Sequence, residues 1–249
     1  MSPLRGLRAA LAWLTVIPVS ADDAADPVPW FPWVAVVPGS AGVVSAAVVA
    51  ALVPGDLGAL LAGVAVVASW AVLTGLMHLD GLADAADALV GTKPREERLR
   101  IMRDSRIGSF GAGVLALTLM ACAASSAVLV SAGRYGAVLL APVMARWGAA
   151  VALSTLPAAR ADGLAARLVS SRPASSYLIA ALPVALVAGL ARPGAVTVAV
   201  GLVAAVSVPR FLSRPVGGLT GDVVGASIVL VENAVLLAAA LVPKGCLLL

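Results

Sequence analysis

The sequence predicts an all-α fold, a polytopic integral membrane helical bundle of about seven transmembrane helices, from three observations. Hydrophobic residues make up 61% of the 249 residues and charged residues only 12%, and the mean hydropathy is +1.03. Apolar runs long enough to cross a bilayer alternate with short polar stretches. Gly and Pro mark the ends of these runs, and neither an internal repeat nor a linker is evident. We therefore interpret residues 1–249 as a single transmembrane domain.

Residues 1–33 precede the first predicted span and are expected to form an N-terminal interfacial segment. Arg5 and Arg8 stand before an apolar run that ends in Val19-Ser20-Ala21, an order that imitates a cleavable signal peptide. Cleavage would carry the basic loop 91–108 to the outside, against the rule that Lys and Arg stay in the cytoplasm. We favour a retained amphipathic or re-entrant segment over a signal peptide.

Seven spans follow this segment if each needs about 20 apolar residues. They are predicted at 34–54, 57–77, 110–132, 135–157, 175–191, 194–212 and 223–242, and the fifth is the shortest.

The basic residues orient these spans. With the N-terminus inside, most of the 17 Lys and Arg residues fall in cytoplasmic loops, whereas Arg134, Arg192 and Lys244 fall outside and Arg146 lies within a span. The sequence thus predicts a multi-pass protein of the cytoplasmic (inner) membrane with a cytoplasmic N-terminus. The net charge of +4 suits this topology and contact with anionic membrane lipid. No basic stripe with interleaved aromatics is present, so no nucleic-acid partner is expected.

The strongest functional signal lies in the predicted cytoplasmic region 78–109, which is first acidic and then basic. The run His78-Leu79-Asp80-Gly81-Leu82-Ala83-Asp84-Ala85-Ala86-Asp87 begins it. In a helix, Asp80, Asp84 and Asp87 point within about 60° of one another. A solvated acidic helix is the simpler explanation, but its opposite face is Ala and Leu, and no basic residue compensates the acids before Lys93. We therefore expect these three aspartates to bind a metal ion.

The donor set indicates which metal. The cluster holds carboxylates and one histidine, and Cys122 and Cys246 have no metal-ligand spacing. Oxygen ligands suit a hard cation, Mg²⁺ or Mn²⁺, and not zinc. Such an ion beside a phosphoanhydride neutralises charge on the leaving group, so the chemistry indicated is displacement at phosphorus.

A second candidate group precedes the third span. Asp104 is flanked by Arg103, Ser105 and Arg106, so its carboxylate suits a metal ion or general-base duty and its neighbours suit a phosphate.

A third group is the glycine-rich turn 217–226, which leads into the last span. Free backbone N–H groups at a helix N-terminus favour anions, so Gly218, Thr220 and Gly221 are candidates for phosphate binding. Asp222 is either the helix cap or a further metal ligand. All the named acids fall at the predicted cytoplasmic ends of spans, where one active site can hold them together.

Two assignments stay open. His78 is either a general base or a packed side chain, because in a continuous helix it points away from the acidic face. Arg146 and Glu232 lie near the middle of spans, where an isolated charge costs on the order of 3 kcal/mol. We expect them to face each other or a polar cavity, either as an ion pair or as a contact to substrate phosphate.

The motifs together resemble the adenosylcobinamide-GDP ribazoletransferase (cobalamin synthase, cobalamin-5′-phosphate synthase) family. The matching blocks are H-x-D-G-L-A-D-x-x-D at 78–87, I-M-R-D-S-R-I-G-S-F-G at 101–111, Arg146-Trp147, and G-G-x-T-G-D-x-x-G-A at 217–226 with Glu232. The resemblance covers nearly the whole chain, although Ala88 stands where many relatives have glycine.

The resemblance implies a Mg²⁺-dependent membrane transferase. Its reaction joins adenosylcobinamide-GDP to α-ribazole, or its 5′-phosphate, giving adenosylcobalamin, or its 5′-phosphate, and GMP. It assigns Asp80, Asp84, Asp87 and Asp222 to the metal, Asp104 to metal or base duty, and Arg103, Arg106 and the turn 217–221 to phosphates.

Two other classes are weighed against this one. Membrane CDP-alcohol phosphotransferases and prenyltransferases also handle diphosphates with aspartate-bound Mg²⁺. A cation or solute transporter predicts acids near the midplane in two related halves, which this sequence lacks. The sequence leaves open whether the protein forms a homo-oligomer and whether other enzymes of cobalamin synthesis dock on its basic loops.

Overall fold

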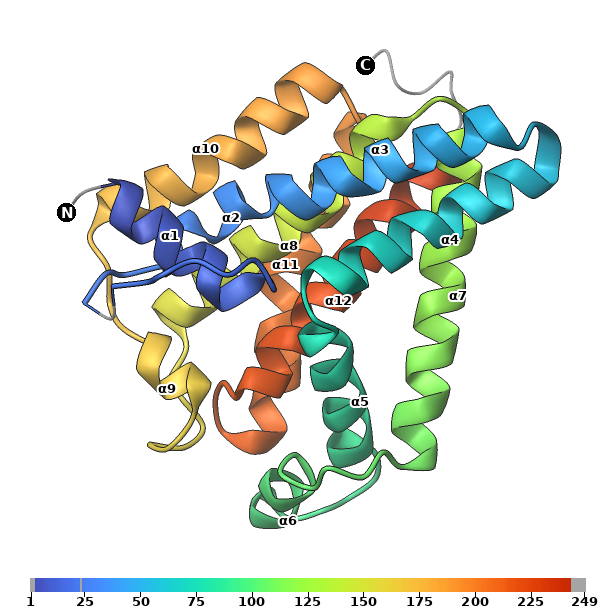
Figure 1. Cartoon of the computed structure of the whole chain (residues 1–249). Coiled ribbons are helices and arrows are strands. Elements are labelled where there is room, and N and C mark those ends of the chain that lie inside the picture. The colour runs from blue at the N-terminus through green and yellow to red at the C-terminus, as the bar shows by residue number, and fades with distance from the viewer. Residues whose placement is uncertain (1–2, 23, 243–249) are drawn as a thin grey trace.

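The structure is a computed structural model that describes residues 3–22 and 24–242, and within them it is helical apart from one isolated β-bridge between Ala158 and Leu219 (Figure 1). The helices are α1 (Pro3–Leu14), η1 (Val28–Trp30), α2 (Phe31–Val34), α3 (Val36–Leu52), α4 (Gly55–Leu73), α5 (Met77–Leu89), α6 (Arg95–Ile101), α7 (Ser109–Ser131), α8 (Tyr135–Thr155), α9 (Leu164–Leu168), α10 (Ala174–Ala191), α11 (Ala195–Ser213), η2 (Arg214–Val216) and α12 (Gly221–Leu241). The all-α prediction is confirmed. The predictions for Lys244 and Cys246 fall outside the described residues.

Seven helical stretches of the described chain are long and apolar enough to cross a membrane. They are Val28–Leu52, Gly55–Leu73, Ser109–Ser131, Tyr135–Thr155, Ala174–Ala191, Ala195–Val216 and Gly221–Leu241. The multi-pass prediction is confirmed. The largest difference is at the first span, which begins at Val28 and so takes in the end of the predicted interfacial segment. Pro29 and Pro32 are the second residues of η1 and α2. In the first turn a backbone N–H has no partner within the helix, so proline fits there.

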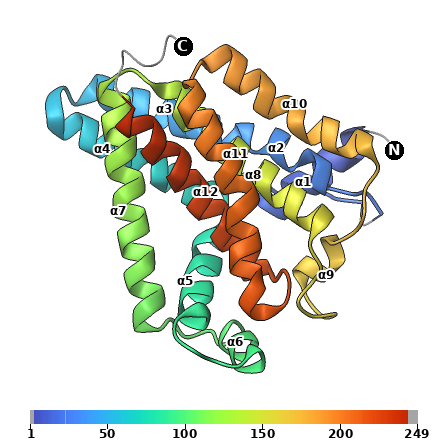
Figure 2. The same cartoon turned by 180° about the vertical axis from the view of Figure 1, so that it is seen from behind.

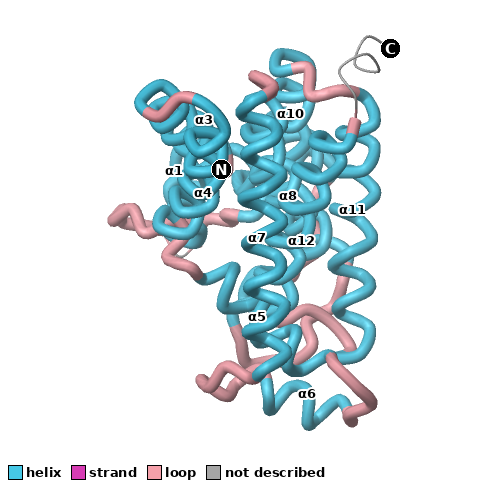
Figure 3. Tube along the Cα trace, turned by 90° about the vertical axis from the view of Figure 1, so that its right-hand side faces the viewer, coloured by secondary structure: helices cyan, strands magenta, loops and turns pink. Residues whose placement is uncertain are grey.

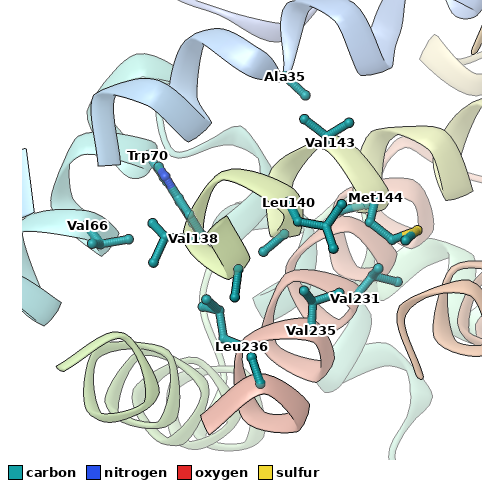
Figure 4. Close-up of a cluster of buried hydrophobic side chains, with 14 of the residues drawn as sticks. Ala35, Val66, Trp70, Val138, Leu140, Val143, Met144, Val231, Val235 and Leu236 are labelled. Atoms are coloured by element: carbon teal, nitrogen blue, oxygen red, sulfur yellow. The ribbon is translucent and has the colours of Figure 1, made fainter. Parts of the chain in front are cut away.

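Helices α8 and α12 form the centre of the bundle. In their apolar windows 78% and 67% of the residues are buried, against 33% or less in the other five spans. Helix α8 contacts α3, α10 and α11 as well as α12, and α12 also packs against α5 and α7 (Figure 2). Figure 4 shows part of this core, where Leu140 and Met144 of α8 join Val231 and Val235 of α12. The other long helices α3, α7, α10 and α11 pack against this central pair, whereas α4 packs against α3 and α7 on the outside.

A sharp turn separates α4 from α5. Helix α4 ends at Leu73, and Gly75 (φ 59°) and Leu76 (φ 58°) both adopt the left-handed conformation. The predicted span to residue 77 therefore stops early, and His78 belongs to α5. Figure 3 shows α5 and α6 together at one end of the molecule, and Figure 1 shows the start of α12 at that same end.

Arg98 of α6 fixes the end of α5. Its guanidinium is buried and donates to the carbonyl oxygens of Ala88 (2.9 Å), Gly91 (2.7 Å) and Lys93 (2.9 Å). A cation at a helix C-terminus satisfies carbonyl groups that have no partner within the helix and complements the helix dipole. Part of the basic region thus stabilises the acidic helix directly.

The two charges predicted in the middle of spans form one buried ion pair. Arg146 of α8 is 1% exposed and Glu232 of α12 is 7% exposed, and Arg146 Nη1 donates to Glu232 Oε1. The expectation that they face each other is confirmed. The pair joins the two central helices, and each charge compensates the other for the cost of its burial.

We predict that Glu232→Ala lowers the free energy of unfolding by about 3–5 kcal/mol, because it leaves the Arg146 guanidinium buried without its counter-charge. The double substitution Arg146→Met/Glu232→Met removes both charges and should cost clearly less. Unfolding in detergent micelles, followed by circular dichroism, measures both. Equal losses in the two variants would contradict the ion-pair explanation.

Candidate functional site

Two glycines bring the acidic helix α5 into backbone contact with α12. A Cβ placed on Gly81 would lie 3.1 Å from Asp222 Cα, and one placed on Gly225 would lie 3.3 Å from His78 Cα. Side chains at either position would hold the helices apart. The glycines of both sequence motifs therefore place the acids of α5 beside Asp222.

Asp84 is at the electrostatic centre of the acidic group. Partial burial, followed by the charges of Asp80, Asp222, Asp87 and Asp104, raises the pKa of its carboxyl from 3.8 to about 6. The four like charges raise this pKa, and a bound cation would lower it again. The structure thus brings the five predicted acids into one electrostatic neighbourhood.

Asp87 has a different task within that group. Its carboxylate accepts hydrogen bonds from the backbone N–H groups of Gly108 (2.7 Å) and Gly111 (2.8 Å), at the start of α7. It therefore caps α7 from another helix, where the dipole favours a negative charge. A Cβ on Gly111 would lie 2.3 Å from Asp87 Oδ2 and 2.7 Å from the Ala83 carbonyl oxygen, so the contact needs glycine there. Asp87 keeps its predicted place near the site but already has two donors.

Thr220, and not Asp222, caps α12. Its hydroxyl oxygen accepts from the Val223 N–H at 3.1 Å. Asp222 stands in the first turn, and its Oδ2 is buried with no hydrogen-bond partner within the described chain. A buried carboxylate oxygen without a donor is costly. The capping explanation of Asp222 is therefore wrong, and its carboxylate suits a cation.

The glycine-rich turn is less open than its sequence suggests. Gly218 is buried, and its N–H donates to the Ser213 carbonyl oxygen at 3.0 Å. Leu219 pairs with the loop after α8, donating to Pro157 O at 2.8 Å, and Arg95 Nε donates to Val216 O at 2.9 Å. The Gly218 N–H is thus already in use, whereas Gly221 lies at the first turn of α12.

The Asp104 group lies on the exposed side of the site. Asp104 accepts from Arg106 Nη2 (2.6 Å), Nε (2.9 Å) and the backbone N–H (3.1 Å), and these bonds lower its pKa to about 2. Such a carboxylate is a weak general base at neutral pH. Arg103 pairs with Asp162 at 2.8 Å, and Ser105 is exposed. The two arginines retain free N–H groups for an anion.

His78 is packed into the helix contact, since α5 is continuous from Met77. Its side chain is 6% exposed, and Nε2 has no partner among the residues described. Burial, and then the Arg146 charge, hold its pKa well below 6.5, so the ring is neutral at pH 7. Arg146 itself is engaged with Glu232 and lies inside the bundle.

A cavity of about 490 Å³ adjoins the contact between α5 and α12. Asp80, His78 and Asp222 line it together with apolar residues of α1, α2 and α9. Its size is that of a small-molecule site. The acids therefore border a space that is large enough for a small molecule.

Sequence reasoning did not single out Arg160, in the loop between α8 and α9. Its Nε and Nη1 are buried without hydrogen-bond partners in the part of the chain described, and its charge acts on the Asp222 carboxylate. A buried cation of this kind suits an anionic ligand. Its sequence signal is one basic residue in a predicted cytoplasmic loop, which many others share.

No three His, Cys, Asp or Glu side chains of the described residues are grouped closely enough to hold a metal ion alone. Mg²⁺ is commonly bound by one or two carboxylates plus substrate phosphates and water, and seldom by an all-protein cage. Asp80, Asp84 and Asp222 supply the carboxylates for that mode, in which one or two of them bind the ion beside the substrate phosphates. The donor set is compatible with Mg²⁺ that arrives with a phosphorylated substrate.

Fold and site together define a class: a multi-pass helical membrane protein with clustered carboxylates and nearby arginines at one end of its bundle. A family model described as cobalamin-5-phosphate synthase matches residues 6–240. The chain belongs to the cobalamin-5-phosphate synthase family and is a membrane enzyme of that family. No solved structure matches it.

Curated relatives agree with this assignment. A protein of Syntrophobacter fumaroxidans is 36% identical over 85% of this chain and 85% of its own length. A protein of Chlorobaculum parvum is 34% identical over 97% of both chains, and one of Pseudomonas paraeruginosa is 43% identical over 69% of this chain and 71% of its own. All three are named adenosylcobinamide-GDP ribazoletransferase. The resemblance inferred from the motifs is confirmed.

We predict that Gly111→Ala lowers the free energy of unfolding by about 1–3 kcal/mol, because its methyl group displaces the Asp87 carboxylate from the start of α7. Gly113→Ala is the matched control on the same helix, since a Cβ there meets no atom within 4 Å. Thermal unfolding in detergent should show a loss only for Gly111→Ala. Equal behaviour of the two variants would contradict the capping role of Asp87.

Proposed function

We propose that the protein is a Mg²⁺-dependent transferase that joins adenosylcobinamide-GDP to α-ribazole or α-ribazole 5′-phosphate. The products are adenosylcobalamin, or its 5′-phosphate, and GMP. One observation carries the proposal: the contact between α5 and α12 places Asp80 and Asp84 beside Asp222, whose buried Oδ2 has no partner among the described residues. The names of the relatives supply the substrates.

Asp80, Asp84 and Asp222 are the residues that would hold Mg²⁺ together with the diphosphate of the donor. An ion held there would neutralise the charge that develops on the departing GMP. Mn²⁺ has the same ligand preference and should substitute for it.

The arginines near the acids bind and orient the phosphates in this proposal. Arg160 has buried N–H groups without partners, and Arg103 and Arg106 keep free donors beyond their ion pairs. Several guanidinium groups around a diphosphate align the leaving GMP opposite the attacking hydroxyl. Attack at the phosphorus on the cobinamide side then releases GMP without a covalent enzyme intermediate.

Proton transfer from the attacking hydroxyl needs an acceptor near the cavity. Asp104, with a pKa of about 2, is poorly suited to this role. His78 lines the cavity and has an unpartnered Nε2 in the described structure, so its position makes it the candidate acceptor, although burial lowers its pKa and weakens it as a base.

The proposal places the protein in the bacterial inner membrane, with its N-terminus and its acidic site in the cytoplasm. The basic loop 91–108 lies at the same end of the molecule as the acids, and the positive-inside rule assigns such loops to the cytoplasm. Nucleotide substrates and released GMP would then exchange with the cytoplasmic pool directly.

We predict that Asp84→Asn lowers turnover by about a thousandfold or more, because it removes a metal ligand whose ion supplies several kcal/mol of transition-state stabilisation. GMP and cobalamin product are measured from purified protein in liposomes with adenosylcobinamide-GDP, α-ribazole and Mg²⁺. The melting temperature should not fall, since the change removes one of several like charges.

The matched control for this test is Asp56→Asn, which alters an exposed aspartate in the first turn of α4. It should retain full turnover. Near-normal product formation by Asp84→Asn would remove the centre of the assignment. Wild-type protein that is folded but inactive with these substrates would direct the search to lipid alcohols and prenyl diphosphates.

We also predict that Mg²⁺ together with the diphosphate substrate raises the melting temperature of the wild-type protein, because a ligand that binds only the folded state stabilises it. Asp222→Asn should lose most of this shift while Asp56→Asn retains it. The readout is thermal unfolding with and without EDTA, and it does not depend on catalysis. A full shift in Asp222→Asn would exclude that carboxylate from the metal site.

A further inference from the structure

The cavity beside the acids has two chemically different parts. Asp80 and Asp222 supply carboxylates, whereas Trp13, Phe31, Leu164 and Ile228 supply apolar surface. These apolar residues come from α1, α2, α9 and α12, so four separate segments of the chain build one pocket. A ligand that fits it combines an apolar, flat body with a polar group that reaches the aspartates.

Trp13 is held in place in this pocket. The Arg167 guanidinium lies 5.6 Å from the centre of the Trp13 ring, a cation–π contact between α1 and α9. Both residues also line a second, polar cavity of about 270 Å³, so they stand between the two spaces. A positioned indole is a surface on which an aromatic base stacks.

The acids restrict which substrate enters here. Both substrates must meet at the same carboxylates, because the attacked phosphorus and the attacking hydroxyl react there. Guanine and the amide groups around a corrin ring carry many hydrogen-bonding groups, which would be unsatisfied against Trp13, Phe31 and Leu164. The base of α-ribazole carries few such groups, and its ribose bears the hydroxyl.

We propose that this cavity is the acceptor subsite, in which an apolar aromatic base stacks on Trp13 and the attached ribose extends to Asp80 and Asp222. The inference rests on the proposed function for the identity of the acceptor. It adds that helices α1 and α9, which carry none of the motif aspartates, determine which base is accepted.

The test separates the Michaelis constants of the two substrates. Trp13→Ala should raise the KM for α-ribazole by about tenfold, which is the usual loss for one stacked base, and leave the KM for adenosylcobinamide-GDP unchanged. Leu164→Trp narrows the same cavity and should act in the same direction. Leu164 is 59% exposed, so the larger side chain is compatible with folding. Leu4→Ala, at a position of α1 that is 63% exposed and outside this cavity, is the control.

Each outcome separates this inference from the proposed function. A raised KM for adenosylcobinamide-GDP alone would place the donor in the cavity and overturn the inference, although wild-type turnover would still support the proposed function. Unchanged KM values for both substrates would also overturn the inference and would indicate that membrane lipid occupies the cavity.

Wild-type protein without product would refute the proposed function. Equilibrium dialysis of α-ribazole would then decide the inference. Weaker α-ribazole binding by Trp13→Ala than by the wild-type protein would support the inference, and equal binding would overturn it.

Discussion

The backbone contact between α5 and α12 is the constraint on which the candidate site depends. Gly81 and Gly225 face each other where the two helices meet, and no side chain fits between them. Because α12 also packs against α8 in the centre of the bundle, the acidic helix is held to the most buried part of the fold. The site is thus built on rigid elements, as precise positioning of reacting groups requires.

The acids within this frame perform different tasks although their sequence pattern is uniform. Asp87 caps α7, and Asp104 is neutralised by Arg106, so both are partly satisfied by the protein. Asp84 and Asp222 are not, since one is opposed by like charges and the other has a buried oxygen without a donor in the described chain. Side chains that the protein leaves unsatisfied are the ones that a ligand can satisfy.

Hydropathy predicted the seven spans because each depends on local composition, which an apolar run carries by itself. Helical periodicity likewise predicted that Asp80 and Asp84 share a face. The capping of α7 by Asp87 was not predictable, since it joins residues more than 20 positions apart and its signal is only the absence of side chains at Gly108 and Gly111. The burial of Arg160 and the cavity at Trp13 were not predictable for the same reason, because both form only when segments that are distant in the sequence meet.

A cluster of carboxylates at a helix contact opposes folding, so its presence has to be offset elsewhere. The buried Arg98 guanidinium stabilises the end of α5, the Asp87 carboxylate stabilises the start of α7, and the Arg146–Glu232 pair joins α8 to α12. These contacts join the helices that carry the acidic cluster to their neighbours and keep it assembled against its own repulsion. The fold therefore maintains Asp84 and Asp222 in an environment that disfavours their negative charge, which is the electrostatic condition for strong attraction of a divalent cation and the phosphates that accompany it.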